Sequence, residues 1–419
     1  MNKLLSAEWI FTIVSLLHYT GGPIVALLAG GASEGDEAAG IPDYDVIKVI
    51  CFVNYAISLL LIILRWKKVT YVLSKDRHIL VMLGLCGISY FWSEVPSLTL
   101  IRTVATIGTS LFGIYIATRY TLKEQLQLLA WTFGIAIILS IIFAIFLPKY
   151  GIMSGVHAGT LRGIYTHKNV LGKLMILSGI VFLLGALNDQ KNRFLLWGGF
   201  VLSIILLLLT KSSSSIVSFG IVMGIFLTLQ ILLLSYNFLF PALFFLAIIA
   251  QGSFLWLANN TELLLSSVGK DATLTGRGPL WNAAIEMIWQ RPWFGYGFSG
   301  FWKGWDTPSA VIWRVVGWTP PNAHNGFLDI CLDLGLVGFA IFLIGFITNL
   351  IKGLTWIRIY RTAAGFWPVM YMIYFWLSNQ AESSLLKQNE IFWLLYVTVI
   401  ISMLIPPEKP TGNHTHLSS

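Results

Sequence analysis

The sequence predicts an all-α, polytopic integral membrane protein in which residues 1–419 form a single transmembrane domain. Of the 419 residues, 56% are hydrophobic and only 11% are charged, and the mean hydropathy is +0.77. These values lie outside the usual range of soluble globular proteins. Apolar runs of about 20 residues, the length that crosses the hydrocarbon layer of a membrane, recur from one end of the chain to the other. They leave no room for a separate soluble domain.

The apolar runs predict about twelve transmembrane helices. The first run has no small-residue cleavage site followed by soluble sequence, so we expect a retained helix rather than a cleaved signal peptide. The only long polar interval between runs gives one large loop, residues 259–323, between spans nine and ten. The spans are predicted near residues 8–30, 44–65, 77–93, 98–118, 123–147, 169–187, 193–210, 213–235, 237–257, 324–350, 363–380 and 389–405.

The basic residues predict the orientation of the chain in the membrane. Lys and Arg gather in the loops after the second, fourth, sixth and tenth spans, and these loops share one parity. The positive-inside rule therefore makes these loops cytoplasmic, together with both termini. The large loop and residues 148–168 and 380–388 then lie on the outer face. Because this pattern explains most of the formal net charge of +8, we do not expect nucleic acid to be a partner.

Within the large loop, residues 279–290 have the pattern of a short amphipathic helix. Pro279 suits the first turn of a helix, and Arg291-Pro292 ends it. We expect the helix to lie on the membrane surface or to cap the bundle, because one stripe holds Leu280, Trp281, Ala284, Ile285, Ile288 and Trp289. The aromatic and glycine-rich stretch that follows includes Trp302 and fits either an interfacial belt or a platform for sugar rings.

His324 is the main candidate for a catalytic group. It follows Pro320-Pro321-Asn322 and stands where the tenth span begins. A helix N-terminus disfavours an imidazolium and favours a bound anion, which suits His324 as a neutral proton acceptor. We therefore predict a general base beside an anion site. The alternative is an interfacial histidine whose ring is satisfied by the backbone.

Arg162 and Arg277 are candidates for binding an anion on the outer face. Each lies beside a glycine, where the absence of a side chain leaves room for a ligand. A guanidinium group can bind phosphate through two parallel hydrogen bonds and does not lose its charge. The alternative is that these arginines pair with Asp271, with Glu286 or with lipid headgroups.

Asp329 and Asp333 lie four residues apart in the tenth span, and hence on one face of the helix. Acidic residues inside a membrane usually line a cavity or pair with a cation. These two could face a polar cavity, or they could lock the bundle, for instance against Arg102 in span four. The sequence leaves both roles open.

Several short motifs resemble those of the O-antigen ligase and polysaccharide polymerase family (Wzy/WaaL-like). The family's histidine motif is similar to His324-Asn325 with Gly335 and Gly338. Its large periplasmic loop is similar to Thr275-Gly276-Arg277 with Trp281, Arg291-Pro292 and Gly295-Tyr296-Gly297. The ExoQ-type exopolysaccharide polymerase branch is the one most resembled by Trp92-Ser93 before Pro96, Arg162-Gly163 with His167-Lys168-Asn169, and Glu382-Ser383-Ser384. The resemblance covers about residues 90–400.

This resemblance implies a GT-C-like, inverting glycosyltransferase of the bacterial inner membrane that needs no metal or other cofactor. Its donor would be a glycan on undecaprenyl diphosphate at the periplasmic face. Arg162 and Arg277 would hold the diphosphate, and His324 would deprotonate the acceptor hydroxyl. The further candidates for substrate binding are His167, Lys168, Asn325, Glu382, Arg102 and Trp302.

Two alternatives concern the acceptor and the class of protein. A polymerase would extend the next lipid-linked repeat unit and would be expected beside a chain-length regulator, whereas a ligase would use lipid A core as its acceptor. The stretches at 162–169 and 382–384 favour the polymerase. A transporter of lipid-linked or anionic substrates would need broken helices or an inverted repeat at the midplane. The polar residues instead concentrate at one face of the membrane.

Overall fold

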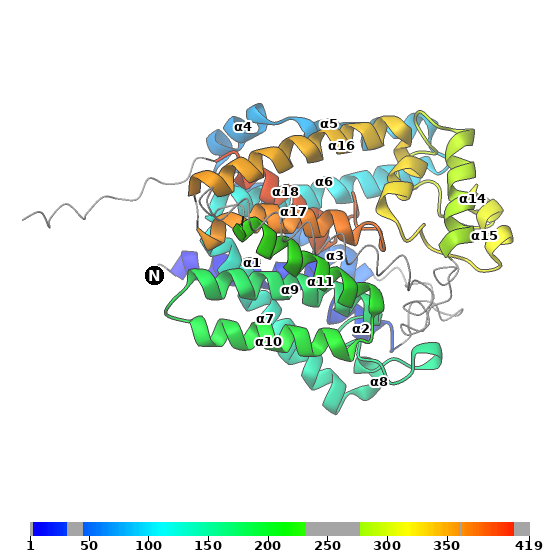
Figure 1. Ribbon diagram of the computed structural model, residues 1–419. Helices are drawn as coiled ribbons and strands as arrows, with labels where there is room; N and C mark the ends of the chain where they lie inside the picture. The colour runs from blue at the N-terminus through cyan, green and yellow to red at the C-terminus, as the bar shows by residue number, and fades with distance from the viewer. Residues whose placement is uncertain (1–2, 32–44, 232–276, 361, 406–419) are drawn as a thin grey trace, which may run out of the picture.

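The computed structural model describes residues 3–31, 45–231, 277–360 and 362–405. Within these ranges the protein is all-helical, as predicted, with one isolated antiparallel bridge between Ile152 and Leu161. Long helices run side by side as a bundle, and α14 and α15, which we call the cap, lie across one end of it (Figure 1). The elements are α1 (Lys3–Tyr19), α2 (Ile24–Leu28), α3 (Asp45–Ile63), α4 (Trp66–Lys75), α5 (His78–Ile88), η1 (Ser89–Trp92), α6 (Pro96–Arg119), α7 (Leu122–Phe146), α8 (Pro148–Gly151), η2 (Gly155–His157), α9 (Lys168–Asn188), α10 (Arg193–Leu209), α11 (Ser213–Ile231), α14 (Arg277–Gln290), α15 (Ser309–Val316), α16 (Gly326–Tyr360), η3 (Ala363–Phe366), α17 (Trp367–Ser378) and α18 (Ile391–Ser402).

The helices support a multi-pass membrane protein. Six stretches of the described chain are long and apolar enough to cross a membrane, and they lie in α3, α6, α7, α9, α11 and α16. Four shorter apolar helices of 10–17 residues, at Leu5–Tyr19, His78–Trp92, Arg193–Leu209 and Ile391–Ser402, lie near four further predicted spans. The predicted ninth span, residues 237–257, and the first part of the large loop lie outside the described residues. The total of twelve spans therefore stays a prediction.

Two elements at the start of the chain differ from the predicted spans. The first span was predicted as one helix over residues 8–30, but α1 ends at Tyr19 and a short α2 begins only at Ile24. The intervening Gly21 has a φ of 85°, which a helix cannot contain, and Pro23 lacks the N–H that would continue the helix. The second difference is α4, an additional helix between the second and third spans whose Val69 and Val72 are buried.

Ion pairs bring the N-terminal helix and three basic loops to one end of the bundle. Glu8 of α1 pairs with Arg65 at 2.8 Å and with Arg119 at 3.0 Å. Lys352 of α16 pairs with Asp76 at 3.1 Å. The cap lies at the opposite end (Figure 1). The predicted grouping of these loops is therefore present in the fold, and their assignment to the cytoplasm stays a prediction.

Helix α16 is broken at Gly335, and the segment that follows α14 fills the break. Gly335 has φ 68° and ψ −171°, and an added Cβ would come within 2.2 Å of the carbonyl oxygen of Trp293. The freed backbone groups still find partners: Leu336 donates to the Pro292 oxygen at 2.7 Å, and the Leu332 oxygen accepts from Tyr296 at 2.8 Å. A break inside a membrane helix is tolerated when other protein groups satisfy its backbone. The glycine and aromatic stretch therefore docks the cap onto the helix that begins beside His324.

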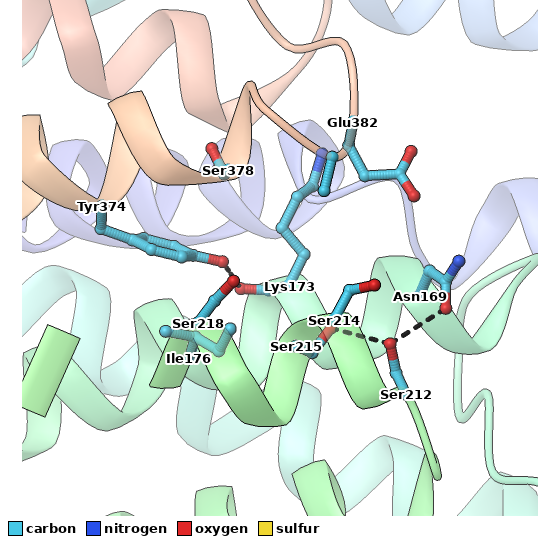
Figure 2. A pocket seen from close by; sticks show the side chains of 11 residues that line it. Asn169, Lys173, Ile176, Ser212, Ser214, Ser215, Ser218, Tyr374, Ser378 and Glu382 are labelled. Atoms are coloured by element: carbon cyan, nitrogen blue, oxygen red, sulfur yellow. Dashed lines mark hydrogen bonds between the residues drawn. The ribbon is translucent and has the colours of Figure 1, made fainter. Parts of the chain in front are cut away.

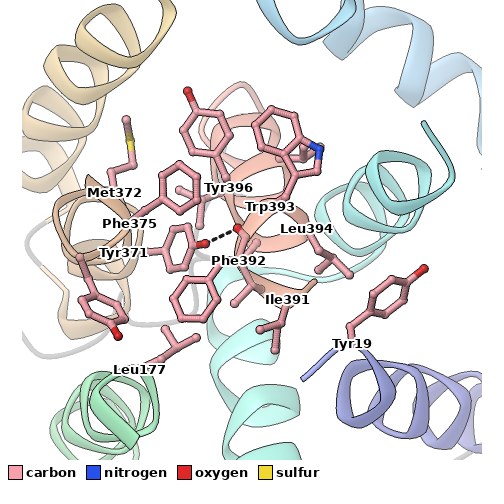
Figure 3. Packing of buried hydrophobic residues seen from close by; sticks show 14 of the residues in the cluster. Tyr19, Leu177, Tyr371, Met372, Phe375, Ile391, Phe392, Trp393, Leu394 and Tyr396 are labelled. Carbon is pink, nitrogen blue, oxygen red and sulfur yellow. Dashed lines mark hydrogen bonds between the residues drawn. The ribbon is translucent and has the colours of Figure 1, made fainter. Parts of the chain in front are cut away.

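The most deeply buried helices are α17 and α18, and they hold the loop between them in place. Every residue of α18 is buried. Aromatic side chains of the two helices interleave (Figure 3), and the Tyr371 hydroxyl donates to the carbonyl oxygen of Phe392. Helix α18 also packs closely on α6, because Trp393 Nε1 donates to Ser110 Oγ at 3.0 Å. Residues 379–390, which include Glu382, thus connect two fixed helices.

The cap helix α14 covers the bundle with one face. Leu280, Ala284 and Ile288 of the predicted stripe are buried, which fits the capping position of the two positions expected for this helix. Ile285 and Trp289 are 42% and 67% exposed, so that part of the predicted stripe points outward. The helix is described over Arg277–Gln290, and the predicted helix spans residues 279–290.

Candidate functional site

His324, Glu382 and Arg277 come together at the cap end of the bundle. His324 Nδ1 lies 3.6 Å from Glu382 Oε2, and Arg277 Nη2 lies 3.9 Å from Glu382 Oε1. The indole of Trp318 stacks on the imidazole, with 6.1 Å between ring centroids and 27° between the planes. We call these four residues the histidine cluster. Glu382 was predicted as a substrate-binding residue, and the structure places its carboxylate against the predicted base.

Hydrogen bonds to side chains fix the turn that carries His324, just before α16 begins. His324 has a φ of 48°, a left-handed conformation that costs a non-glycine residue roughly 1–2 kcal/mol. Its N–H donates to Asn322 Oδ1 at 2.8 Å. Asn325 Oδ1 accepts from the N–H groups of Phe327 and Leu328 at 3.0 and 3.3 Å, and so caps α16. Asn325, a predicted substrate-binding residue, therefore helps to start the helix.

The cluster is electrostatically arranged for a histidine that becomes protonated. Burial would raise the pKa of Glu382, but His324, Lys173 and Arg277 lower it to about 2. The carboxylate is therefore ionised throughout the physiological range and can stabilise an imidazolium. The 3.6 Å separation is longer than a hydrogen bond, and buried Nδ1 has no hydrogen-bond partner within the described part of the chain. Catalytic contacts are often loose before the substrate binds.

Arg162 lies in a different setting from the one that the sequence suggested. Its side chain is 1% exposed, and its guanidinium donates to the carbonyl oxygens of Tyr150 at 2.8 Å, Lys149 at 2.7 Å and Gly31 at 2.8 Å. It thus holds residues 148–163 in shape. A diphosphate would have to replace some of these carbonyl groups to bind Arg162. The sequence could not show these bonds, because they depend on the local fold of that segment.

The predicted pair His167 and Lys168 begins α9. His167 Nδ1 accepts from the N–H of Asn169 at 3.1 Å and caps the helix. One turn further, Lys173 was not predicted as a site residue. Its ammonium donates to Glu390 Oε1 and Ser384 Oγ, both at 2.8 Å. A lysine within an apolar span was the available signal, since intramembrane charges usually have a functional partner.

A small polar cavity lies between α9, α11 and the loop that carries Glu382. Figure 2 shows Lys173 extending from α9 toward that loop, with the serines of α11 beside it. Ser212 Oγ donates to Asn169 Oδ1 at 3.0 Å. The cavity has a volume of about 30 Å³, and its lining includes Lys173, Ser212, Ser215, Tyr374 and Glu382. We call it the serine cavity.

A larger cavity lies next to the histidine cluster and contains charges of both signs. Its volume is about 120 Å³, and its lining includes Arg102, Trp302, Lys303, Asn322, Asp329, Asp333, Ser383 and Lys387. We call it the charged cavity. Burial and the nearby Arg102 lower the pKa of Lys303 to about 8, although Asp333 acts in the opposite direction. Both aspartates line this cavity together with Arg102 and Trp302, and Asp329 is also hydrogen-bonded to Trp302 and Ser383.

No group of three or more His, Cys, Asp and Glu side chains with metal-ligand geometry occurs among the residues that the structure describes. The reaction without a metal remains a prediction, and chelation tests it.

Two comparisons with known proteins bear on this site. A family model described as O-antigen ligase matches residues 198–343, which include Arg277 and His324. The exopolysaccharide production protein ExoQ of Rhizobium meliloti (strain 1021) is 27% identical over 298 residues, which are 68% of this chain and 66% of the relative. The match thus spans just under two thirds of the relative's length. The two matches agree with the resemblance of the sequence motifs to the O-antigen ligase and polysaccharide polymerase family.

Proposed function

We propose that this protein is an inverting membrane glycosyltransferase that polymerises the repeat units of an exopolysaccharide or O-antigen. In this proposal the donor is a glycan on undecaprenyl diphosphate, and the acceptor is a sugar hydroxyl of the next lipid-linked unit. The reaction takes place on the periplasmic face of the bacterial inner membrane. The observation that carries the proposal is the histidine cluster, in which a carboxylate ionised down to about pH 2 lies 3.6 Å from the imidazole.

The proposed step is a single displacement at the anomeric carbon. Glu382 faces Nδ1 of His324, so that Nε2 is the nitrogen that accepts the proton of the acceptor hydroxyl. The acceptor oxygen forms a bond to C1 of the donor sugar while the bond from C1 to the diphosphate oxygen breaks. The electron pair leaves with undecaprenyl diphosphate. A positioned base of this kind contributes roughly 10²- to 10⁴-fold in rate.

Arg277 is the proposed ligand of the leaving diphosphate. It is the arginine of the cluster, and a guanidinium stabilises the charge that develops on a phosphate oxygen as the bond breaks. Its ion pair with Glu382 is 3.9 Å long, which leaves donors of the guanidinium for a second anion. Arg162 is proposed as a second ligand, which would exchange carbonyl partners for phosphate when the donor binds.

The charged cavity is the proposed site for the acceptor glycan. Its lining includes Asn322, which lies two residues before His324, and Ser383, which directly follows Glu382. Trp302 offers an aromatic face to a sugar ring, and Arg102 and Lys303 offer hydrogen-bond donors to its hydroxyl groups. An acceptor held there lies beside the base.

The polymerase and the ligase differ only in the acceptor, and two observations point in different directions. The family model that matches residues 198–343 is described as O-antigen ligase, whereas the curated relative is described as an exopolysaccharide production protein. We favour the polymerase, because the match to that relative extends over 68% of the chain.

Purified protein in lipid nanodiscs tests the proposal. It is incubated with a lipid-linked repeat unit, alone or together with lipid A core, and the products are separated by length. A ladder of longer lipid-linked glycans, joined with inverted anomeric configuration, is the expected result. Transfer only to lipid A core would replace the polymerase with the ligase. Vectorial movement of the substrate without a new glycosidic bond would replace both with the transporter.

A further inference from the structure

We propose that Asp329 is a positioning residue that fixes the geometry of the His324 and Glu382 pair through its hydrogen bonds rather than through proton transfer. This inference rests on the proposed function, because it concerns how the same site is held. Asp329 lies in the first turn of α16, one turn after His324. Its carboxylate contacts three segments that are far apart in the sequence.

Both oxygens of the Asp329 carboxylate accept hydrogen bonds, and two of the donor residues adjoin His324 or Glu382 in the sequence. Oδ1 accepts from the N–H of Ala323 at 3.0 Å and from Trp302 Nε1 at 2.8 Å. Oδ2 accepts from the hydroxyl of Ser383. Ala323 immediately precedes His324, and Ser383 immediately follows Glu382. The Asp329 carboxylate therefore links the segment that contains His324 to the segment that contains Glu382.

The same hydrogen bonds explain how His324 keeps a backbone conformation that is unfavourable for a non-glycine residue. His324 has a φ of 48°, and such conformations persist at functional sites when the surrounding contacts fix them. The Ala323 N–H is held by Asp329 and the His324 N–H by Asn322 Oδ1. Ser383 Oγ also lies 3.4 Å from Asn322 Oδ1. Asn322, Ser383 and Asp329 thus form one hydrogen-bonded network that holds the backbone at His324.

A positioning role and an acid-base role predict opposite results for an isosteric substitution. In D329N the amide oxygen can still accept from Trp302 and Ala323. The amide nitrogen can donate to Ser383 Oγ, whose own proton can turn to Asn322. All three hydrogen bonds can still form in D329N, although their partner is no longer an ionised carboxylate. In D329L none survives.

We expect kcat to fall by less than about tenfold in D329N and by more than about 100-fold in D329L, with KM within about threefold in both. These limits follow from the rate that a displaced catalytic group forfeits. Loss of more than 100-fold in D329N, in protein that is monodisperse and still binds the lipid-linked unit, would show that the carboxylate itself is required and would overturn the proposal. So would a wild-type kcat in D329L.

Ser383→Ala and Trp302→Phe keep the test decisive if D329L fails to fold. Ser383→Ala removes the hydrogen bonds that link the segment of Glu382 to Asp329 and to Asn322, so the acid limb of the pH profile, the loss of rate toward low pH, should move to lower pH while kcat falls. Trp302→Phe removes one hydrogen bond on the other side and should lower kcat without moving that limb. An unshifted limb in Ser383→Ala would overturn the link to Glu382. Inactive wild-type protein would instead refute the proposed function.

Discussion

Replacing Glu382 by Gln removes the charge that faces the base and keeps the shape of the side chain. The acid limb of the pH profile, which is the loss of kcat/KM toward low pH, should then move to lower pH, and kcat should fall. The limb does not report Glu382 itself, because the pKa of this carboxylate is lowered to about 2. It reports the group that must be unprotonated to accept the proton of the acceptor.

The size of the effect follows from the geometry. Two unit charges 3.6 Å apart attract one another by about 1 kcal/mol in water and by about 5 kcal/mol at an effective dielectric constant near 20. Because the side chains of His324 and Glu382 are 26% and 29% exposed, we expect the lower part of this range, about 1 to 3 kcal/mol. That corresponds to a fall in kcat of roughly 5- to 150-fold and to a shift of the acid limb by about 1 to 2 pH units.

Initial rates of polymer formation between pH 5 and 9, at saturating and limiting lipid-linked substrate, measure both quantities. Glu286→Gln is the matched control, since Glu286 lies on the exposed face of α14 outside the histidine cluster. An acid limb that stays in place in Glu382→Gln, or moves to higher pH, would refute the role of Glu382 as the partner of the imidazolium.

Three further outcomes are expected. Arg277→Lys should lower kcat by roughly tenfold or more, because an ammonium cannot make the two parallel hydrogen bonds of a guanidinium; an unchanged kcat would remove Arg277 from the reaction. Activity should persist in EDTA, and loss that magnesium or manganese restores would contradict the metal-free mechanism. In intact cells, an impermeant maleimide should label cysteine placed at exposed Glu286 of the cap and spare cysteine at exposed Lys67 of α4; the reverse pattern would place the site in the cytoplasm. The native cysteines Cys51, Cys86 and Cys331 are buried.

Local features of the site could be predicted because they depend on neighbouring residues. Pro320-Pro321-Asn322 before His324 indicated a helix start, and α16 begins at Gly326. The stripe of residues 280–288 indicated a helix that lies on the membrane surface or caps the bundle, and α14 is a helix there. In each case the periodicity and the turn residues alone decide the local structure.

Features that depend on distant contacts could not be predicted. Residues 336–350 continue an apolar run, so the break at Gly335 becomes visible only where residues 292–296 supply its hydrogen bonds. Glu382 was proposed from resemblance as a substrate ligand. Its place beside His324 results from the packing of α17 and α18, which the sequence does not specify locally. The sequence offers Arg162 as an anion ligand or as a partner of acidic groups, whereas in the structure its guanidinium donates to the carbonyl groups of Tyr150 and Lys149.

His324→Ala tests the central claim most directly. The variant is purified in nanodiscs beside the wild-type protein and supplied with the lipid-linked repeat unit. Binding of the lipid-linked unit should be retained, because the charged cavity and Arg277 remain. The rate of glycosidic bond formation should fall by roughly 10²- to 10⁴-fold, the contribution of a positioned general base. A variant that is folded, binds substrate and polymerises at the wild-type rate would contradict the assignment of His324 as the base and the mechanism built on it.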